Sequence, residues 1–420
     1  MRRAGFLLLA MLGLATALST RAQLPQVPLP RVPVPGVPET SRTLTGTLRE
    51  LAGARALRVE RLLRENRTEL DRDPRGDLVI HAEVVAIDIT PSALDKAIAA
   101  GFRVLRTEAL QDLGLDVTVL ETPEGMSAAR GLKRLRKLDP DGLYDFNHVY
   151  LGSGLVEQAD ASTVHREEAD VPRAGDEVAL ARVGLIDTGV DGGHVAVRGP
   201  RLHHFGCDGR QVPDPHGTAV ASILVGGRNV GDLYAADVYC GEPTGGAVDA
   251  VARALGWMAR ERVAVVNVSL VGPRNSLLER AVRSLVARGH IVVAAVGNDG
   301  PSSPPLYPAA YEGVVGVTGV DARHRVLIEA LRGKQVDFAA RGADMRAASQ
   351  APDQFVVVRG TSFAAPQVAA LFAGMLAPDA AARTREIDRL TALAQDLGKP
   401  GRDDVYGAGL VAADPVQQVK

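Results

Sequence analysis

Three short segments of the sequence carry residues that can act together in acid–base and nucleophilic chemistry. Asp187 follows the apolar run 183–186, His216 opens a run of small residues, and Ser362 lies just after Gly360. A serine hydroxyl is a poor nucleophile at neutral pH unless a base lies within hydrogen-bond reach. Histidine is such a base once an aspartate holds its tautomer. The three residue types therefore indicate hydrolysis by an activated serine.

The segment around Ser362 has the pattern of a strand, a tight turn and a helix. The β-like run 355–358 precedes Gly360, which can turn sharply because it lacks a Cβ. At the start of a helix, unpaired N–H groups and the helix dipole favour negative charge, as on a developing oxyanion. Pro366 donates no bond four residues back, so the Ser362 carbonyl loses a helical partner. The alternative is a serine in an ordinary joint.

A fourth motif, residues 292–300, runs from an apolar stretch into Gly297, Asn298 and Asp299. Acyl transfer puts negative charge on a carbonyl oxygen, and a side-chain amide such as that of Asn298 can stabilise it. An asparagine in a turn between glycines is the alternative interpretation of this motif.

The chain order Asp, His, Ser, together with these four motifs, resembles the subtilisin-like serine proteases (subtilases, peptidase family S8). The resemblance implies a three-layer α/β domain with a mainly parallel central sheet. It also implies catalytic Asp187, His216 and Ser362, with Asn298 and the Ser362 backbone N–H in the oxyanion hole. No organic cofactor is implied. Calcium is frequent in the family, but no acidic loop identifies a site, and we predict no metal ligands.

The resemblance also implies a protein or peptide substrate, bound along residues 266–272 as an added strand. A pocket for the side chain before the scissile bond (P1) would lie between this stretch and residues 294–297. Val271 and Val296 stand where the family usually has smaller residues, and neither stretch contains an acid. We expect a narrowed pocket for small or medium apolar side chains. The predicted substrate-binding residues are Ser269, Leu270, Val271, Gly272, Ala294, Ala295, Val296 and Gly297.

Length and composition describe an ordinary globular protein. The 420 residues suffice for two domains, or for one large domain with an extra segment, and 46% hydrophobic residues can fill a sizeable core. The net charge of −2 gives no reason to expect nucleic-acid binding.

The first residues have the pattern of a signal peptide, which we place at residues 1–22. Arg2 and Arg3 precede an apolar run at 6–18 that is too short to span a membrane. A non-cleaved anchor is the alternative. We expect a secreted or periplasmic protein with no stable membrane span after signal removal. Residues 23–40 are rich in proline and are typical of an extended linker.

Cys207 and Cys240 are the only cysteines. An even pair in an exported chain usually forms a disulfide, and this one would close a loop around His216. Two buried free thiols are the alternative.

Residues 41–155 predict a separate N-terminal region. The pattern is helical from Leu44 to Leu70, and strand, helix, strand, helix and strand follow between Leu78 and Tyr150. This small α+β layout, placed before a protease-like domain, resembles the inhibitory prodomain of the subtilisin family and would be a partner of residues 156–420. An unrelated accessory domain is the alternative. Residues 151–176 look polar and irregular, and we expect maturation cleavage there.

From Val183 onward, apolar strand-like runs alternate with helical patterns, as in a parallel sheet covered on both faces. Sites in such sheets gather at the carboxyl ends of strands, where Asp187, Asn298 and Ser362 each follow a run. The predicted strands are 183–186, 235–239, 263–268, 291–296 and 314–317, and the predicted helices are 218–224, 247–259, 277–288 and 363–376.

These observations favour a secreted or periplasmic serine endopeptidase, made as a self-processing precursor and acting through an acyl-enzyme. One rival is a catalytically silent scaffold on the same fold. A second is an esterase, although the G-x-S-x-G motif is absent around Ser362. A third is a protease whose only target is its own N-terminal segment.

Overall fold

The computed structural model describes residues 56–152, 154–157, 181–226, 230–242, 244–375 and 377–411. The predicted signal peptide and proline-rich linker lie outside these residues, as does most of the predicted cleavage segment. Residues Thr45–Lys420 make one compact unit, so the domain boundary predicted at residue 155 stays a prediction. Within the described part of the chain, no helix combines the length and the apolar character needed to cross a bilayer.

The centre of the structure is a seven-stranded sheet in which every neighbouring pair is parallel. Most residues of its middle strands are apolar and fully buried, as expected for a sheet covered on both faces. All five predicted strands are confirmed, and two at the edges were missed, one being polar and the other short. In spatial order the strands are β15 (Phe338–Arg341), β14 (Val315–Val320), β13 (Ile291–Ala295), β11 (Val265–Val268), β8 (Ala181–Asp187), β10 (Val230–Asp237) and β9 (Arg201–Phe205).

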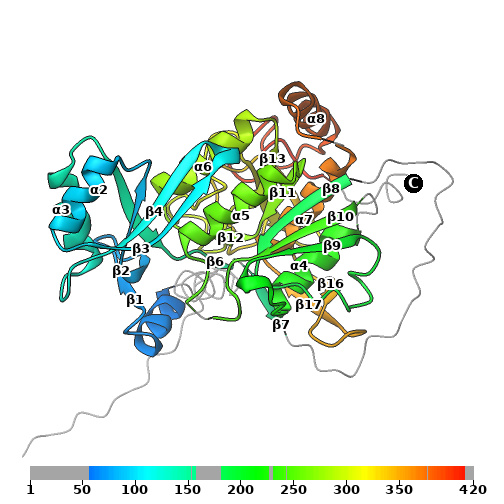
Figure 1. Cartoon of the computed structure of the whole chain (residues 1–420). Coiled ribbons are helices and arrows are strands. Elements are labelled where there is room, and N and C mark those ends of the chain that lie inside the picture. Colours follow the sequence, from blue (N-terminus) through cyan, green and yellow to red (C-terminus); the bar gives the residue numbers. More distant parts are fainter. Residues whose placement is uncertain are drawn as a thin grey trace, which may run out of the picture. The chain divides into compact units, whose positions relative to one another are not determined.

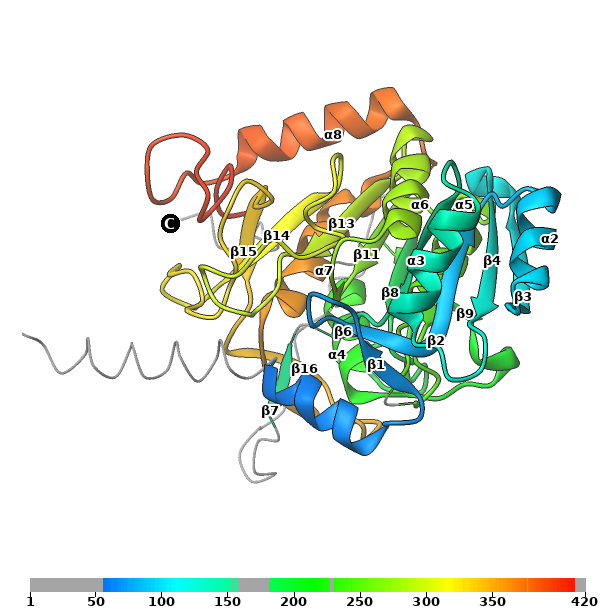
Figure 2. The same ribbon diagram turned by 90° about the vertical axis from the view of Figure 1, so that its left-hand side faces the viewer.

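Helices cover both faces of this sheet (Figures 1 and 2). The helices α5 (Val248–Arg260) and α6 (Ser276–Ala287) share one buried cluster with Ile186 of β8. The helices α4 (Pro215–Gly226) and α7 (Thr361–Leu371) share the other cluster with Leu185. Successive β8 residues thus point to opposite faces, which makes the peptidase-like region a three-layer α/β structure.

The carboxyl-terminal helices differ in part from the prediction. The helix predicted at 363–376 begins earlier, and α7 gives way to a 3-10 turn at Phe372–Gly374. A further helix, α8 (Ala380–Leu393), was not predicted; most of its side chains are exposed, and only Leu390 is buried. Its apolar periodicity is therefore weak.

Two small antiparallel sheets lie beside the main one. The strand β12 (Leu270–Val271) pairs with β6 (Leu151–Gly152). The strand β17 (Phe355–Arg359) lies between β16 (Met345–Ala348) and β7 (Leu155–Glu157). The prediction of an irregular segment from residue 151 was therefore wrong for β6 and β7, which gain strand structure only by pairing with distant partners. The strand that precedes Ser362 belongs to the second small sheet and not to the parallel sheet.

The N-terminal region is a five-stranded antiparallel sheet with two helices. A helix at 56–65 precedes it and ends before Leu70, which begins a strand, so the prediction of a helix up to residue 70 was wrong. The strand β3 was missed because charged and polar residues make up half of it. The elements are β1 (Leu70–Arg72), β2 (Leu78–Ile87), α2 (Pro91–Ala99), β3 (Arg103–Leu110), β4 (Leu115–Glu121), α3 (Ala128–Leu138) and β5 (Leu143–His148).

The two faces of this N-terminal sheet have different neighbours. One face packs on α2 and α3, and the other contributes residues such as Val85 and Val119 to the cluster of α5 and α6. Side-chain hydrogen bonds also join this sheet to α5. Arg106 Nε donates to Asp249 Oδ2 at 2.7 Å, and Asn147 Nδ2 donates to Asp249 Oδ1 at 3.0 Å. Burial alone would raise the pKa of Asp249, but Arg106, Arg253 and Asn147 together outweigh it and hold the pKa below its usual range.

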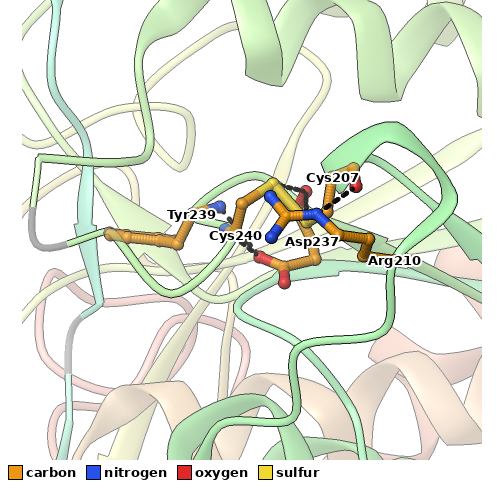
Figure 3. The surroundings of a disulfide bond; sticks show 5 residues. All are labelled: Cys207, Arg210, Asp237, Tyr239 and Cys240. Carbon is orange, nitrogen blue, oxygen red and sulfur yellow. Dashed lines mark hydrogen bonds between the residues drawn. A yellow bond between two sulfur atoms is a disulfide. The ribbon is translucent and has the colours of Figure 1, made fainter.

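The predicted disulfide between Cys207 and Cys240 is present, with Cα atoms 5.1 Å apart (Figure 3). Cys207 follows β9 and Cys240 follows β10, so the bridge joins the ends of two neighbouring strands. The Asp237 carboxylate accepts the backbone N–H groups of Tyr239 and Cys240 at 2.9 and 2.8 Å, which holds the second cysteine in its turn.

We expect the double variant Cys207→Ser, Cys240→Ser to unfold more easily than the wild type. The bridge spans 33 residues, and closing a loop of that length stabilises the fold by about 3–4 kcal/mol in the chain-entropy model. Urea unfolding of both chains in a Ser362→Ala background measures the difference. The chain with both cysteines reduced is the matched control and should unfold at the same urea concentration as the variant. Equal stability of the oxidised chain and the variant would contradict the expectation.

Candidate active site

Asp187 and His216 form a buried pair at the carboxyl end of the central strands. Asp187 ends β8 and is fully buried, and its Oδ1 lies 2.7 Å from Nδ1 of His216. With Nδ1 donating to the carboxylate, Nε2 is left as the acceptor, the tautomer a general base needs. Nε2 is buried and has no hydrogen-bond partner among the described residues.

The position of His216 is set by a local network at the start of α4. Asp214 accepts the His216 backbone N–H at 2.8 Å and the Thr188 hydroxyl at 2.9 Å. The same hydroxyl accepts the Gly217 N–H at 2.8 Å. A Cβ at Gly217 would lie 2.3 Å from the Thr188 carbonyl oxygen, so only glycine permits this approach. The network fastens the first turn of α4 to the residue after Asp187.

The charged groups around His216 raise the pKa of its imidazole. Burial alone lowers the pKa of its imidazole, but the Asp187 carboxylate raises it more, by charge and by hydrogen bond. Asp214 adds to the rise, and the Arg58 guanidinium opposes it. The resulting pKa lies above the ordinary value of 6.5, which suits a group that takes up a proton and later returns it.

Ser362 lies in the first turn of α7 and is fully buried. Gly360, just before the helix, has φ = 139°, a conformation that glycine adopts without strain. The Ser362 carbonyl, which Pro366 leaves without a helical donor, accepts the Ser269 hydroxyl at 3.2 Å. The next residue, Phe363, packs its ring 5.5 Å from that of His216, so the serine-bearing turn lies beside the histidine.

Asn298, on the loop after β13, is joined to the same turn of α7. Its side-chain Oδ1 accepts the Thr361 N–H at 3.1 Å, and the Thr361 hydroxyl accepts the Gly297 N–H at 3.2 Å. Because Oδ1 faces the helix backbone, the donor Nδ2 is on the other side of the amide, as an oxyanion donor requires.

The segment after β5 crosses the site as an added strand. Leu270 of β12 pairs with Gly152 of β6. A Cβ at Gly152 would lie 3.5 Å from His216 Cε1, and one at Gly154 would lie 3.3 Å from Nε2. Gly152 and Gly154 therefore both lie against the imidazole.

Tyr150, two residues earlier, is fully buried in a fitted pocket. Its hydroxyl donates to the Pro273 carbonyl at 2.6 Å, and its own carbonyl accepts the Tyr239 hydroxyl at 2.5 Å. A Cβ at Gly272 would lie 2.5 Å from the Tyr150 ring, so this glycine makes room for the aromatic side chain.

The predicted P1-pocket residues divide between the two faces of the sheet. Val271, Ala294 and Val296 lie in the cluster with α5 and α6, and each is at most 3% exposed. Ala295 packs in the opposite cluster, with α4 and α7. With Leu270, which lies in the first cluster too, the structure gathers four of the predicted side chains on one side and turns Ala295 away.

Sequence reasoning did not single out Thr188, Asp214 or Arg58 among the residues near His216. A signal for Asp214 was present, because an aspartate followed by proline is typical of a helix N-cap with proline at the first helical position. Thr188 and Arg58 had no such signal, since their roles depend on distant segments.

Among the described residues, a group of three potential metal ligands is formed by Cys207, Asp237 and Cys240. It does not suit a cation, because both sulfur atoms are already joined in the disulfide. No step of the chemistry is assigned to a metal.

Comparisons with known proteins agree on one family. Residues 181–409, just over half of the chain, match the model of the subtilase family. The minor extracellular protease Epr of Bacillus subtilis (strain 168) is 31% identical over 206 residues, which are 47% of this chain and 32% of Epr. Subtilisin BL of Lederbergia lenta is 30% identical over 244 residues, 56% of this chain and 89% of that protein.

A solved structure extends the likeness in fold. Fervidolysin from Fervidobacterium pennivorans, a keratinolytic enzyme related to subtilisin, has a TM-score of 0.63 at 18% identity. The match covers 80% of this chain, a larger share than residues 181–409 make up, and 60% of fervidolysin. The chain thus spans about a third of the length of Epr and less than two thirds of that of fervidolysin.

We expect His216 in the Ser362→Ala chain to titrate above pH 6.5, because Asp187 stabilises its protonated form. Asp187→Asn should bring the midpoint below 6.5, since burial then dominates. Asp214→Asn keeps an acceptor for the His216 N–H and should lower the midpoint by less. Nuclear magnetic resonance of the imidazole measures all three; an unchanged midpoint in Asp187→Asn would refute the assigned pairing.

Proposed function

The chain belongs to the subtilase family of serine-type endopeptidases, and we propose that it is made as a precursor that cleaves itself and then other proteins or peptides. Asp187, His216 and Ser362 form the proposed triad, and Asn298 is the proposed oxyanion donor. The pairing of Asp187 with His216 at 2.7 Å and the attachment of Asn298 to α7 support these roles.

In the proposed mechanism Ser362 Oγ attacks the carbonyl carbon of the scissile bond while His216 Nε2 takes its proton. Asp187 stabilises the resulting imidazolium, and Asn298 with the Ser362 N–H stabilises the oxyanion. His216 then gives the proton to the leaving amine, which departs and leaves an acyl-enzyme. Water, deprotonated by the same histidine, hydrolyses the ester and restores Ser362.

The observation that carries self-processing is the course of the chain's own residues through the site. Gly152 pairs with β12, the predicted substrate-lining segment, and β7 pairs with β17, which leads to Ser362. Gly152, in the first pairing, and Gly154, just before the second, lie against His216. A peptide held by strand addition on both sides of a catalytic histidine is in the extended form that proteases bind.

The N-terminal region is the proposed first substrate and an intramolecular inhibitor. Its sheet packs on α5 and α6, and its last strand leads directly into the site. We further propose export to the periplasm or beyond. The signal-like first 22 residues and the disulfide support this, because structural disulfides persist in oxidising compartments.

We expect the chain from Leu24 onward to split within residues 151–176. The cut should fall close to Gly152 and Gly154, which lie beside His216. Ser362→Ala should stay whole, because loss of the nucleophile slows such enzymes by more than about 10⁴-fold. Mass spectrometry over time measures both. Ser92→Ala, which changes an exposed serine of the N-terminal region, is the control and should split like the wild type.

Two results would contradict the proposal. If wild type and Ser362→Ala both stay folded and whole, self-processing is absent. If a fluorophosphonate probe then also fails to label Ser362 after the N-terminal region has been removed by another protease, the silent-scaffold alternative is favoured.

We also expect the mature enzyme to cleave a peptide library best after small or medium apolar residues, because Val271 and Val296 would narrow the predicted P1 pocket. Val271→Gly should shift the preference toward larger side chains by about 10-fold, the effect of one or two methylene groups in a pocket. Val195→Gly, at an exposed valine, is the matched control. Preferred cleavage after Arg or Lys would refute this assignment.

A further inference from the structure

The helix at residues 56–65 lies next to the candidate active site and is not part of the core of the α+β unit. Residues 56–65 are helical and precede β1. The core between the sheet and the helices α2 and α3 contains no residue of this helix. Its buried residues Val59 and Leu62 instead join a separate cluster whose other members include Val149 and Leu151. The helix therefore packs on the segment that enters the active site.

A charged side chain of the same helix reaches the site itself. Arg58 Nη1 donates to the carbonyl oxygen of Gly152 at 3.1 Å, across 94 positions in sequence. Gly152 is the residue whose Cβ position lies 3.5 Å from the His216 ring. A hydrogen bond from a guanidinium to a carbonyl is charge-assisted and stronger than a neutral one.

The space around Arg58 suits a positive charge. A cavity beside His216 is lined by Arg58 and Leu62 of the helix and by Asp214 and Glu242 of the peptidase-like region. The two carboxylates provide negative potential on the side facing the helix. A second contact joins the regions nearby, since the Thr244 hydroxyl donates to Glu69 at 3.0 Å.

We propose that helix 56–65 is a latch that holds Leu151 and Gly152 in the active site, with Arg58 as the residue that fastens the Gly152 carbonyl. The effect of this latch on activity rests on the proposed peptidase function. When the chain has been cut at a bond on the carboxyl side of the Gly152–Ser153 bond, the latch retains the new carboxyl end and delays access of other substrates. Arg58 is a positioning residue, because it acts through the bound segment and not on the reacting atoms.

The experiment uses the chain from Leu24 onward as wild type, Arg58→Ala, Arg58→Lys and Arg64→Ala. Arg64 is an exposed arginine on the same helix and serves as the matched control. Self-cleavage is followed by mass, and access to Ser362 by fluorophosphonate labelling. We expect the self-cleavage rates of all four chains to agree within about 3-fold. We expect the lag between cleavage and labelling of Ser362 to be about 10-fold shorter in Arg58→Ala than in the wild type. Arg58→Lys, which keeps a cationic donor, should restore most of the lag.

A second measurement tests the latch without activity. In the Ser362→Ala background, amide hydrogen exchange in residues 149–152 should be about 10-fold faster in Arg58→Ala than in Arg64→Ala. Leu62→Ala, which weakens the apolar side of the same helix, should have a similar effect and replaces Arg58→Ala if that variant does not fold. Equal exchange in all variants would overturn the latch.

The two proposals fail in different ways. If the wild type is neither cut nor labelled but exchange responds to Arg58, the peptidase function fails and the latch stands. If the wild type is cut and labelled but Arg58→Ala matches Arg64→Ala in both lag and exchange, the latch fails and the peptidase function stands.

Discussion

The rest of the site depends on the hydrogen bond between buried Asp187 and His216. A carboxylate with no exposed surface needs a charged or hydrogen-bonding partner, because desolvation otherwise disfavours its ionised form. The parallel sheet buries Asp187 between β10 and β11, and α4 then brings His216 to it. Thr188 and Asp214 tie the start of α4 to the end of β8. Most of the local architecture therefore keeps this one pair aligned.

The other side of the site is formed by the first turn of α7, in which the Ser362 carbonyl lacks its usual hydrogen bond within the helix. Pro366 removes one donor from α7, and Ser269, from the segment between β11 and β12, supplies another. Thr361 joins the same turn to Asn298. Two separate segments thus bond to the first turn of α7, which contains Ser362. Such preorganised donors avoid the cost of reorienting during a reaction.

The N-terminal region contacts the peptidase-like region in two ways. Its sheet docks on α5 and α6 with apolar contacts and the partly buried Arg106–Asp249 pair, while its last residues enter the site as β6. Polar bonds at the first interface favour one register of docking, since a misplaced partner would leave buried charges unpaired. Correct docking in turn places Gly152 over His216. The sheet contact and the strand contact therefore depend on each other.

Much of the main fold followed from local patterns. The central strands β8, β11 and β13 are mostly apolar and buried, and α5 and α6 have clear helical periodicity, so the three-layer architecture was predicted. The edge strand β9 and the mixed strand β3 were not predicted, because polar residues interrupt any apolar pattern, and β15 was missed because it is only four residues long. The short strands β6 and β7 exist only through pairing with β12 and β17. A local pattern contains no information about such partners.

For the site, the sequence by itself determined which residue types were available and in what order: Asp187, His216 and Ser362, with Pro366 freeing the serine carbonyl. Only the tertiary structure decided which groups complete them. Ser269 lies 93 positions from Ser362, and Arg58 lies 94 from Gly152, so neither contact has a local signal. Each arises because packing of the sheet, the helices and the N-terminal region brings distant segments within hydrogen-bond distance, and side-chain chemistry then selects the partner.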